Sequence, residues 1–381
     1  MEQHGHNILS RPTWAEINLD NLASNFHSIK KRVGAAPKIM AMVKANAYGH
    51  GARQCAKRLA AEGADWFGVA TPEEGIELRE TGITQPILCA AGFWSTQAQL
   101  CIQHKLTPVI YRLDMAELLD RAARDAGVVA DVHVKIDTGM GRLGVRFDAL
   151  DEFAARFAQF RSLRVDGLLT HFAAADDSTC QALTSHQIER FEESVEFFRQ
   201  RGFKPTHCHL ANSAAIYSQP KAFGNMVRPG GALYGLWRDV LPPCESDPQL
   251  APVMSLYSEI IALKWVPAGE TVGYACTFEA PRRTLIATLP IGYHDGFIRA
   301  LSNKGRVMLR STYAPVVGRI SMDLTLLDVT DVNDVEIGDR VTLMGREDSL
   351  EITAEQIAQT AGTLSYEVTC GISHRVPRIY R

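Results

Sequence analysis

The sequence predicts a (β/α)8 barrel over residues 12–240, followed by a mostly β domain over residues 241–381. Eight apolar runs alternate with amphipathic segments through residue 228, which is the rhythm and size of such a barrel. No GxGxxG sequence follows the first run, which disfavours the rival open, doubly wound sheet. After residue 240 the pattern changes to short β-branched runs separated by turns, which indicates a second domain.

The eight apolar runs are the expected parallel strands, because strands that are covered on both faces form continuous apolar stretches. They are Lys38–Val43, Trp66–Ala70, Pro86–Ala90, Pro108–Tyr111, Val132–Ile136, Val165–Thr170, His207–Leu210 and Asn225–Arg228. Helix signals separate them. Asp20 is placed to cap a helix whose apolar stripe runs from Leu22 to Val33 and which ends at Gly34. Thr71-Pro72-Glu73-Glu74 has the form of a capping box with proline at the first helical position.

The second domain is predicted to follow a Pro-rich linker at residues 241–252. Its expected strands are Leu256–Leu263, Thr284–Leu289, Arg306–Leu309, Pro315–Ile320, Leu324–Val329 and Arg340–Met344. Thr353–Thr360 is its clearest helix. Residues 1–19 are a candidate source of one more strand, because Trp14–Leu19 alternates as an edge strand would.

Composition narrows the class of protein. The 381 residues are 46% hydrophobic and 22% charged, which is typical of globular chains. The net charge of −3 gives no general reason to expect a nucleic-acid or membrane partner. The longest uncharged stretch, Thr81–His104, is too polar to predict a membrane span. The first twelve residues lack the apolar core of a signal peptide, and the eight cysteines form no CxxC, so we expect a cytoplasmic protein with reduced thiols.

Candidate catalytic residues lie where barrel sites form, at the carboxyl ends of the strands. Lys44 ends the first run before a Gly-rich loop, where partial desolvation would favour the neutral amine that forms a Schiff base. The alternative is a lysine whose stem packs at a strand end. Lys135 lies on the same face of the fifth run as Asp137, and Arg142 follows in a loop suited to holding an anionic oxygen. A structural ion pair is the alternative there.

A phosphate site is predicted after the seventh and eighth runs. Asn212 and Ser213 open a helix, and Gly230 and Gly231 follow Arg228, so that free backbone N–H groups form an anion cradle. A lysine beside such a cradle suggests pyridoxal phosphate (PLP) over a metal.

Two histidines end successive runs, His171 the sixth and His209 the seventh. A lone core histidine is usually structural, but two at successive strand ends favour a site. His207, Cys208 and His209 are of zinc-ligand type, yet no further spaced cluster supports a metal, and we expect none.

Five segments, in order, give the chain a specific resemblance to a known family. They are AMVKANAYGHG, KIDTGMGRLG, LANSAA with VRPGGALYG, VGYACTF with LPIGYHDG, and GRISMDL, with RVPRIY at the end. From Thr13 onward the chain resembles the alanine racemases, PLP-dependent enzymes with a barrel and a β domain. The resemblance implies a homodimer with shared active sites that interconverts L-alanine and D-alanine by two bases, supplying D-alanine for peptidoglycan.

The resemblance also implies residue roles. Lys44 matches the lysine that binds PLP and acts as the base on one face of the substrate. Tyr274 matches the base on the opposite face, which the partner subunit supplies. Arg228 matches the arginine at the pyridine nitrogen, His171 the histidine that joins the tyrosine to that arginine, and His209 the histidine behind it.

The remaining implied roles concern binding. The cofactor-binding residues implied, in addition to those above, are Tyr48, Asn212, Ser213, Gly230, Gly231 and His374. Arg142 matches the arginine near the cofactor phenolate and the substrate carboxylate, and Lys135 a lysine that is often carbamylated to orient it. The substrate-side residues implied are Tyr293, Met322 and Asp323. The chain departs from the family pattern at Gly231, Phe278, His294 and His374.

Three other functions are consistent with parts of the sequence. A broad-specificity amino-acid racemase of the same fold is the nearest alternative. A PLP-homeostasis protein shares a similar barrel and lysine, but lacks the β domain and so any counterpart of Tyr274, Met322 and Asp323. A metal-dependent barrel hydrolase is the third.

Overall fold

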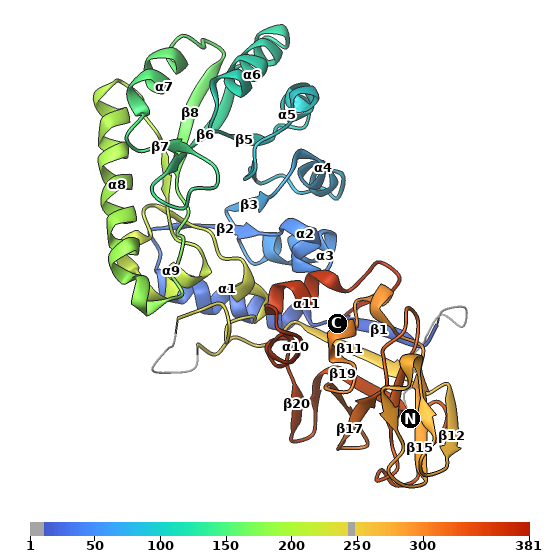
Figure 1. The fold of residues 1–381 in the computed structure, drawn as a ribbon. Coiled ribbons are helices and arrows are strands. Elements are labelled where there is room, and N and C mark those ends of the chain that lie inside the picture. The colour runs from blue at the N-terminus through green and yellow to red at the C-terminus, as the bar shows by residue number, and fades with distance from the viewer. Residues whose placement is uncertain (1–10, 243–247) are drawn as a thin grey trace. The chain divides into compact units, whose positions relative to one another are not determined.

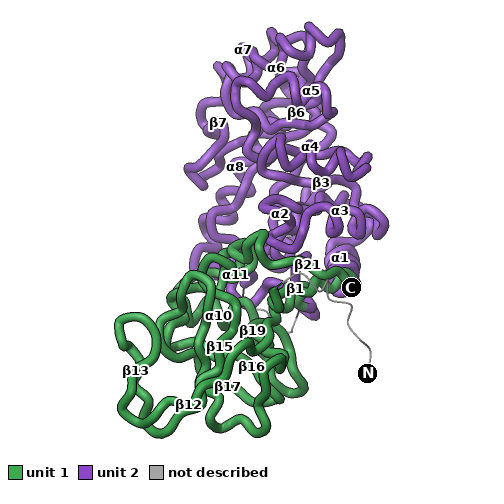
Figure 2. The backbone as a smooth tube through the Cα atoms, turned by 90° about the vertical axis from the view of Figure 1, so that its right-hand side faces the viewer, with its two compact units in different colours: residues 1–19, 252–381 green, residues 20–251 purple. Residues whose placement is uncertain are grey.

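The structure, a computed structural model, describes residues 11–242 and 248–381. The chain forms two compact units, residues 20–251 and residues 1–19 with 252–381 (Figure 2). The division at 251–252 falls inside the Pro-rich segment, and the Trp14–Leu19 run goes with the C-terminal unit.

The larger unit contains the predicted barrel, whose strands are all parallel to their neighbours. In sheet order they are β10 (Met226–Val227), β2 (Lys38–Met42), β3 (Trp66–Val69), β4 (Ile87–Cys89), β5 (Thr107–Ile110), β6 (Ala130–Asp137), β8 (Leu163–Leu169) and β9 (His207–His209). The short β7 (Val145–Arg146) adds to β6. The Asn225 N–H donates to the Cys208 carbonyl (3.1 Å), and the Arg228 N–H to the Ala211 carbonyl (2.9 Å). These bonds join the two ends of the sheet, so the predicted (β/α)8 barrel is confirmed.

Helices surround these strands (Figure 1). They are α1 (Leu19–Val33), α3 (Ala52–Ala61), α4 (Pro72–Glu80), α5 (Ala98–Gln103), α6 (Leu113–Asp125), α7 (Leu150–Phe157), α8 (Gln181–Gln200) and α9 (Ser213–Ser218). The apolar stripe of α1 is buried, as its spacing predicts. No helix in the described ranges is long and apolar enough to cross a bilayer.

The capping box predicted at the start of α4 is wrong, although the helix does begin at Pro72. The Thr71 side chain makes no cap bond to the helix. The Glu74 carboxylate instead accepts the backbone N–H groups of Ala70 and Ala45, each at 2.7 Å. A tertiary contact thus replaces the local one.

The smaller unit is mostly β, as predicted. Its main sheet has the order β12 (Ala262–Val266), β15 (Thr284–Leu289), β18 (Thr325–Asp328), β17 (Thr312–Val317), β16 (Arg306–Leu309), β19 (Arg340–Glu347), β11 (Met254–Glu259), β1 (Thr13–Ile17) and β21 (Arg378–Tyr380), with β20 (Leu350–Ile352) beside β19. Two helices, α10 (Ala354–Ala361) and α11 (Ser365–Gly371), follow, and a separate hairpin pairs β13 (Thr271–Val272) with β14 (Phe278–Glu279).

The single strand expected at Leu256–Leu263 is two strands. The Ile260 N–H donates to the Asp339 carbonyl, whereas the Ile261 N–H donates to the Thr288 carbonyl. The backbone therefore changes partner between these residues, from the β19 side of the sheet to β15. The run itself cannot reveal such a change, because residue type does not specify the strand with which each residue pairs.

Candidate active site

Lys44 begins a turn whose backbone is left-handed. The short α2 (Lys44–Tyr48) has φ near +50° at Ala45, Asn46, Ala47 and Tyr48. None of these residues is glycine, and the left-handed conformation costs roughly 1–2 kcal/mol per residue. The surrounding structure must therefore hold the turn in place.

One tertiary contact and several local ones supply that support. Glu74 accepts the Ala45 N–H at 2.7 Å, and Asn46 Oδ1 accepts the Ala52 N–H at 2.7 Å. The buried His50 ring donates from Nδ1 to the carbonyls of Ala47 and Tyr48, both at 2.9 Å. The turn is fixed from three directions, and Lys44 Nζ lies 5.9 Å from the centre of the Tyr48 ring.

Arg228 is buried and makes four hydrogen bonds to protein acceptors. Nη1 donates to His209 Nδ1 (2.9 Å) and to the His209 carbonyl (2.7 Å). Nη2 donates to the carbonyls of Thr170 (2.6 Å) and Leu210 (2.9 Å). A guanidinium has five N–H donors. Four of the five Arg228 donors are used by these bonds. The fifth, Nε–H, makes no hydrogen bond to a described residue and can therefore donate to a ligand.

Two buried histidines extend this network into the barrel. Because Arg228 can only donate, His209 Nδ1 must be the acceptor and the His209 proton must lie on Nε2. His209 Nε2 lies 2.8 Å from His133 Nδ1. Burial lowers the pKa of His133 to about 3 and that of His209 well below its ordinary value. Both rings are therefore neutral, and the direction of each hydrogen bond is set by Arg228.

Cationic side chains gather at the carboxyl ends of the strands. Burial lowers the pKa of Lys135 to about 8, and the charges of Arg142, Arg228 and Lys44 add to the effect, with Asp137 opposing it. The pKa of His171 is lowered first by burial and then by the charges of four side chains, which are those of Arg228, Lys135, Arg142 and Lys44. Asp137 accepts the backbone N–H groups of Gly139 and Gly141, both at 3.0 Å. Such a cluster is suited to anionic groups of a ligand.

The loop predicted to form an anion cradle lies beside the start of α9. Ser213 Oγ accepts the N–H groups of Gly230 (2.8 Å) and Ala232 (3.3 Å), so its own proton is available to a ligand. Asn212 instead caps α9, because its Oδ1 accepts the Ala215 N–H at 3.0 Å. A Cβ atom at Gly230 would collide with the Tyr48 hydroxyl, which ties this loop to the Lys44 turn.

These residues fit PLP. The site offers a lysine for a Schiff base, the Ser213 hydroxyl for a phosphate, and one free guanidinium N–H for a ring nitrogen. Where Gly230 approaches Tyr48, any side chain would fill the cradle.

The other expected site residues lie in the smaller unit. Tyr274 is in the loop of the β13–β14 hairpin, in a 3₁₀ turn (Tyr274–Cys276), and its side chain is 71% exposed. Tyr293 and Met322 lie on adjoining segments, since the Tyr293 N–H donates to the Ser321 carbonyl (3.0 Å) and the His294 N–H to the Met322 carbonyl (3.1 Å). Both side chains are exposed.

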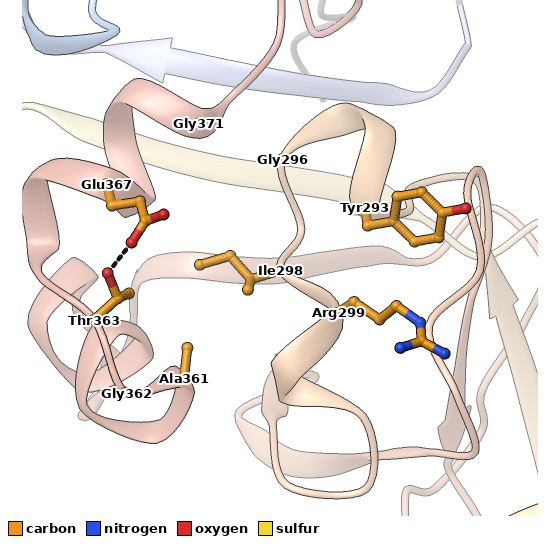
Figure 3. Close-up of a pocket in the computed structure, with 9 residues that line it drawn as sticks. All are labelled: Tyr293, Gly296, Ile298, Arg299, Ala361, Gly362, Thr363, Glu367 and Gly371. Carbon is orange, nitrogen blue, oxygen red and sulfur yellow. Dashed lines mark hydrogen bonds between the residues drawn. The ribbon is translucent and has the colours of Figure 1, made fainter.

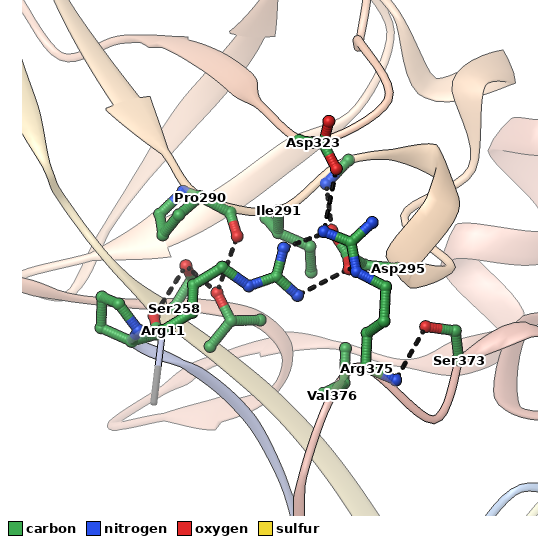
Figure 4. A network of polar contacts seen from close by, with 12 residues as sticks. Arg11, Ser258, Pro290, Ile291, Asp295, Asp323, Ser373, Arg375 and Val376 are labelled. Carbon is green, nitrogen blue, oxygen red and sulfur yellow. Dashed lines mark hydrogen bonds and ion pairs between the residues drawn. The ribbon is translucent and has the colours of Figure 1, made fainter. Parts of the chain in front are cut away.

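Asp323 belongs to a charge network that Figure 4 shows. Arg375 lies 2.9 Å from Asp323 and 3.3 Å from the buried Asp295, which also pairs with Arg11 at 2.6 Å. Asp295 accepts the Gly292 N–H as well (2.9 Å), so the network fixes the turn that carries Tyr293. His374 precedes Arg375 and is exposed.

A cavity of about 440 Å³ opens beside this turn (Figure 3). Its lining includes Tyr293 and Arg299 on one side and Thr363 and Glu367 of the α10–α11 region on the other. Thr363 hydrogen-bonds Glu367, as the dashed line in Figure 3 shows.

Sequence reasoning missed residues that act on the site through other residues. Glu74 holds the Lys44 turn and His133 holds His209. His133 had a usable signal, because it alternates with Lys135 and Asp137 on one strand face. Glu74 had none, because its sequence neighbours predict a helix cap.

Comparisons with known proteins agree with this architecture. The family model for the N-terminal domain of alanine racemase matches residues 17–237, and that for the C-terminal domain matches residues 253–380. Alanine racemases of Citrifermentans bemidjiense and Geobacter sulfurreducens are both 42% identical; each alignment covers 97% of this chain, and 99% and 97% of the relatives, respectively. The alanine racemase structure from Clostridium difficile aligns with a TM-score of 0.91 at 38% identity, covering 98% of this chain and 96% of that one. The chain belongs to the alanine racemase family.

Proposed function

We propose that the protein interconverts L-alanine and D-alanine with PLP as its cofactor. The observation that carries this proposal is the convergence of Lys44, Lys135, Arg142 and Arg228 around a neutral His171, beside the Ser213–Gly230 cradle. Anionic groups of a ligand would complement the positive charge of this cluster, and a phosphate together with a substrate carboxylate would supply them. Its relatives at 42% identity are named as alanine racemases.

PLP, when bound, accepts the negative charge that develops at the substrate Cα. Lys44 removes or returns the proton on one face of that carbon, and Tyr274 does so on the other. Two bases on opposite faces change the configuration without turning the substrate over. Arg142 orients the substrate carboxylate, and Lys135, as a carbamate, would orient Arg142 by accepting its N–H groups.

Arg228 controls which reaction occurs. Its guanidinium remains charged at neutral pH, because burial lowers its pKa only to about 10. It therefore donates a hydrogen bond from Nε to the ring nitrogen but does not protonate it. With Arg228 at its ring nitrogen, the cofactor would be less electron-withdrawing than a protonated one, which would favour racemisation over transamination.

The other roles follow the family pattern. Tyr48, Ser213, Gly230, Gly231 and His374 contact the phosphate, Asn212 shapes the cradle, and His209 backs Arg228. Tyr293, Met322 and Asp323 line the substrate side. The enzyme acts as a cytoplasmic homodimer with shared sites, and its product D-alanine serves peptidoglycan synthesis.

Chiral analysis of a panel of L-amino acids incubated with the purified holoenzyme tests this function. We expect D-alanine to form fastest, and borohydride followed by peptide mapping to fix the cofactor on Lys44. Equal turnover of serine, lysine or arginine would favour the broad-specificity alternative. A pyridoxyl group on a different lysine would refute the assignment of Lys44.

A further inference from the structure

The hairpin that carries Tyr274 has weak support of its own. β13 and β14 are two residues each and form a separate two-stranded sheet, which is marginal in water. Val272 and Phe278 pack on a small core of Val266, Ala280, Ile286 and Val317. That packing fixes the base of the hairpin, but the loop itself, residues 273–277, is exposed.

The loop is also strained. Ala275 and Cys276 have φ values of +59° and +49°. Residues other than Gly, Asn and Asp rarely adopt this backbone conformation. Each left-handed residue costs roughly 1–2 kcal/mol, so contacts from outside the hairpin are needed to hold this conformation.

Asn303 makes such a contact. Its Nδ2 donates to Thr277 Oγ1 (3.1 Å) and to the Thr277 carbonyl (3.4 Å) at the end of the loop. Its Oδ1 accepts the Gly318 N–H at 2.6 Å. Both functions of one amide are used, and asparagine also tolerates the left-handed backbone found at this position, where φ is +56°.

Gly318, whose N–H donates to Asn303 Oδ1, belongs to the segment that leads to Met322 and Asp323. The neighbouring Ser302 Oγ accepts the Ile320 N–H at 3.0 Å, so the two consecutive side chains hold the segment at two points. Gly273 lies against the same segment, because a Cβ there would be 3.5 Å from the Arg319 nitrogen. Asn303 therefore connects the Tyr274 loop to the segment that precedes Met322.

We propose that Asn303 is a positioning residue that fixes Tyr274 for proton transfer. This inference rests on the proposed function, in which Tyr274 is one of the two bases. Since a displacement of about 1 Å can slow a reaction 100-fold, a loosened loop should slow the proton transfer made by Tyr274 and spare the one made by Lys44.

The test is Asn303→Gly, which keeps the positive φ and removes all three side-chain hydrogen bonds. We expect kcat/KM to fall by about 3- to 10-fold, the effect of losing roughly one net hydrogen bond. The decisive readout is the isotope effect measured with L-alanine and with D-alanine deuterated at Cα. It should rise for the enantiomer whose proton Tyr274 removes and not for the other.

Tyr274→Phe identifies that enantiomer, and Ser302→Ala is the matched control. Ser302 hydrogen-bonds Arg299 and Ile320 but, among the described residues, not Thr277, so its removal should leave both isotope effects at their wild-type values. If Asn303→Gly does not fold, Thr277→Val removes one acceptor of the same contact and should produce a smaller shift in the same direction.

A one-sided isotope effect in Tyr274→Phe with unchanged effects in folded Asn303→Gly and Thr277→Val would refute the role of Asn303 alone. Equal rises for both enantiomers in the Asn303 variant would refute it too, because they would indicate general damage. Wild-type isotope effects in Tyr274→Phe would overturn the role of Tyr274 as a base, and the role of Asn303 with it.

Discussion

At the scale of single residues, the main feature of the barrel site is a buried cation without an acidic neighbour. Arg228 forms no ion pair with any described residue, and its partners are carbonyls and a neutral histidine. A carboxylate beside Arg228 would neutralise the charge that an anionic ligand is to meet. The neutral network of His209 and His133 orients the guanidinium and leaves its charge available.

The buried histidines should make the protein sensitive to acid. The pKa of His133 is about 3 in the folded chain against an ordinary 6.5, so the unfolded chain binds a proton across that window and the folded chain does not. Stability should therefore fall as the pH falls from about 6.5 towards 3. Chemical unfolding at a series of pH values measures this, and His133→Gln should flatten the dependence.

The matched control is His186→Gln, because His186 is exposed on α8. It should leave the pH dependence of stability as in the wild type. His133→Leu, which removes the acceptor for His209 Nε2, should destabilise the protein by about 1–3 kcal/mol at neutral pH, whereas glutamine can still accept that bond. Equal losses in the two His133 variants would contradict the hydrogen-bond direction inferred here.

Lys135 should react with carbon dioxide. Its pKa of about 8 leaves an appreciable fraction of neutral amine at neutral pH, and a carbamate would turn one of four clustered cations into an anion. Protein incubated with ¹³C-bicarbonate should show a carbamate resonance in its ¹³C spectrum. Lys135→Met should lose that resonance and raise KM for alanine; a resonance that persists in the variant would place the modification elsewhere.

At the scale of elements, the left-handed turn of α2 is the least expected feature. It is held by Glu74, Asn46 and His50, so its strain is offset by one tertiary and several local hydrogen bonds. Its benefit is geometric, since it ends β2 abruptly and begins at Lys44, the residue proposed to bind PLP.

Ala45→Gly tests the strain. Ala45 is exposed with φ +52°, so glycine removes the left-handed cost without loss of buried surface. We expect thermal unfolding to show unchanged stability or a gain of up to about 1 kcal/mol. Ala155→Gly, at an exposed position inside the right-handed α7, should cost roughly 0.5–1 kcal/mol. A similar loss in both variants would show that the turn is not strained.

At the scale of the whole molecule, the proposed site needs residues from two compact units. Lys44 lies in the unit of residues 20–251, and Tyr274 lies in the other. A shared-site dimer predicts that Lys44→Ala chains, which should be inactive, and Tyr274→Phe chains, which should keep only a low rate, recover activity when they are unfolded together and refolded. Random pairing makes about half of the dimers hybrid with one intact site in two, so recovery should approach about a quarter of wild type.

Hybrid formation can be verified with differently tagged chains. Each variant refolded alone is the control and should stay at its residual rate. If purified hybrids are no more active than these controls, each site belongs to one chain or Tyr274 is not a base.

The sequence by itself determined the barrel and the position of its candidate site residues. Eight apolar runs predict eight buried parallel strands, and Lys44, His171, His209 and Arg228 all fall at their carboxyl ends. This much is readable because burial on both faces and strand order act through residue type and spacing alone.

The tertiary structure decided what local pattern cannot encode. The residue types of Thr71 and Glu74 predict a capping box that does not form. Residues 45–48 contain no glycine that would predict a left-handed turn. The Leu256–Leu263 run does not indicate that its backbone changes partner strand. His133, Glu74 and Asn303 likewise gain their roles from partners distant in sequence. In each case a hydrogen bond from another segment outweighs the local preference, because a buried or strained backbone must find its partners wherever the fold provides them.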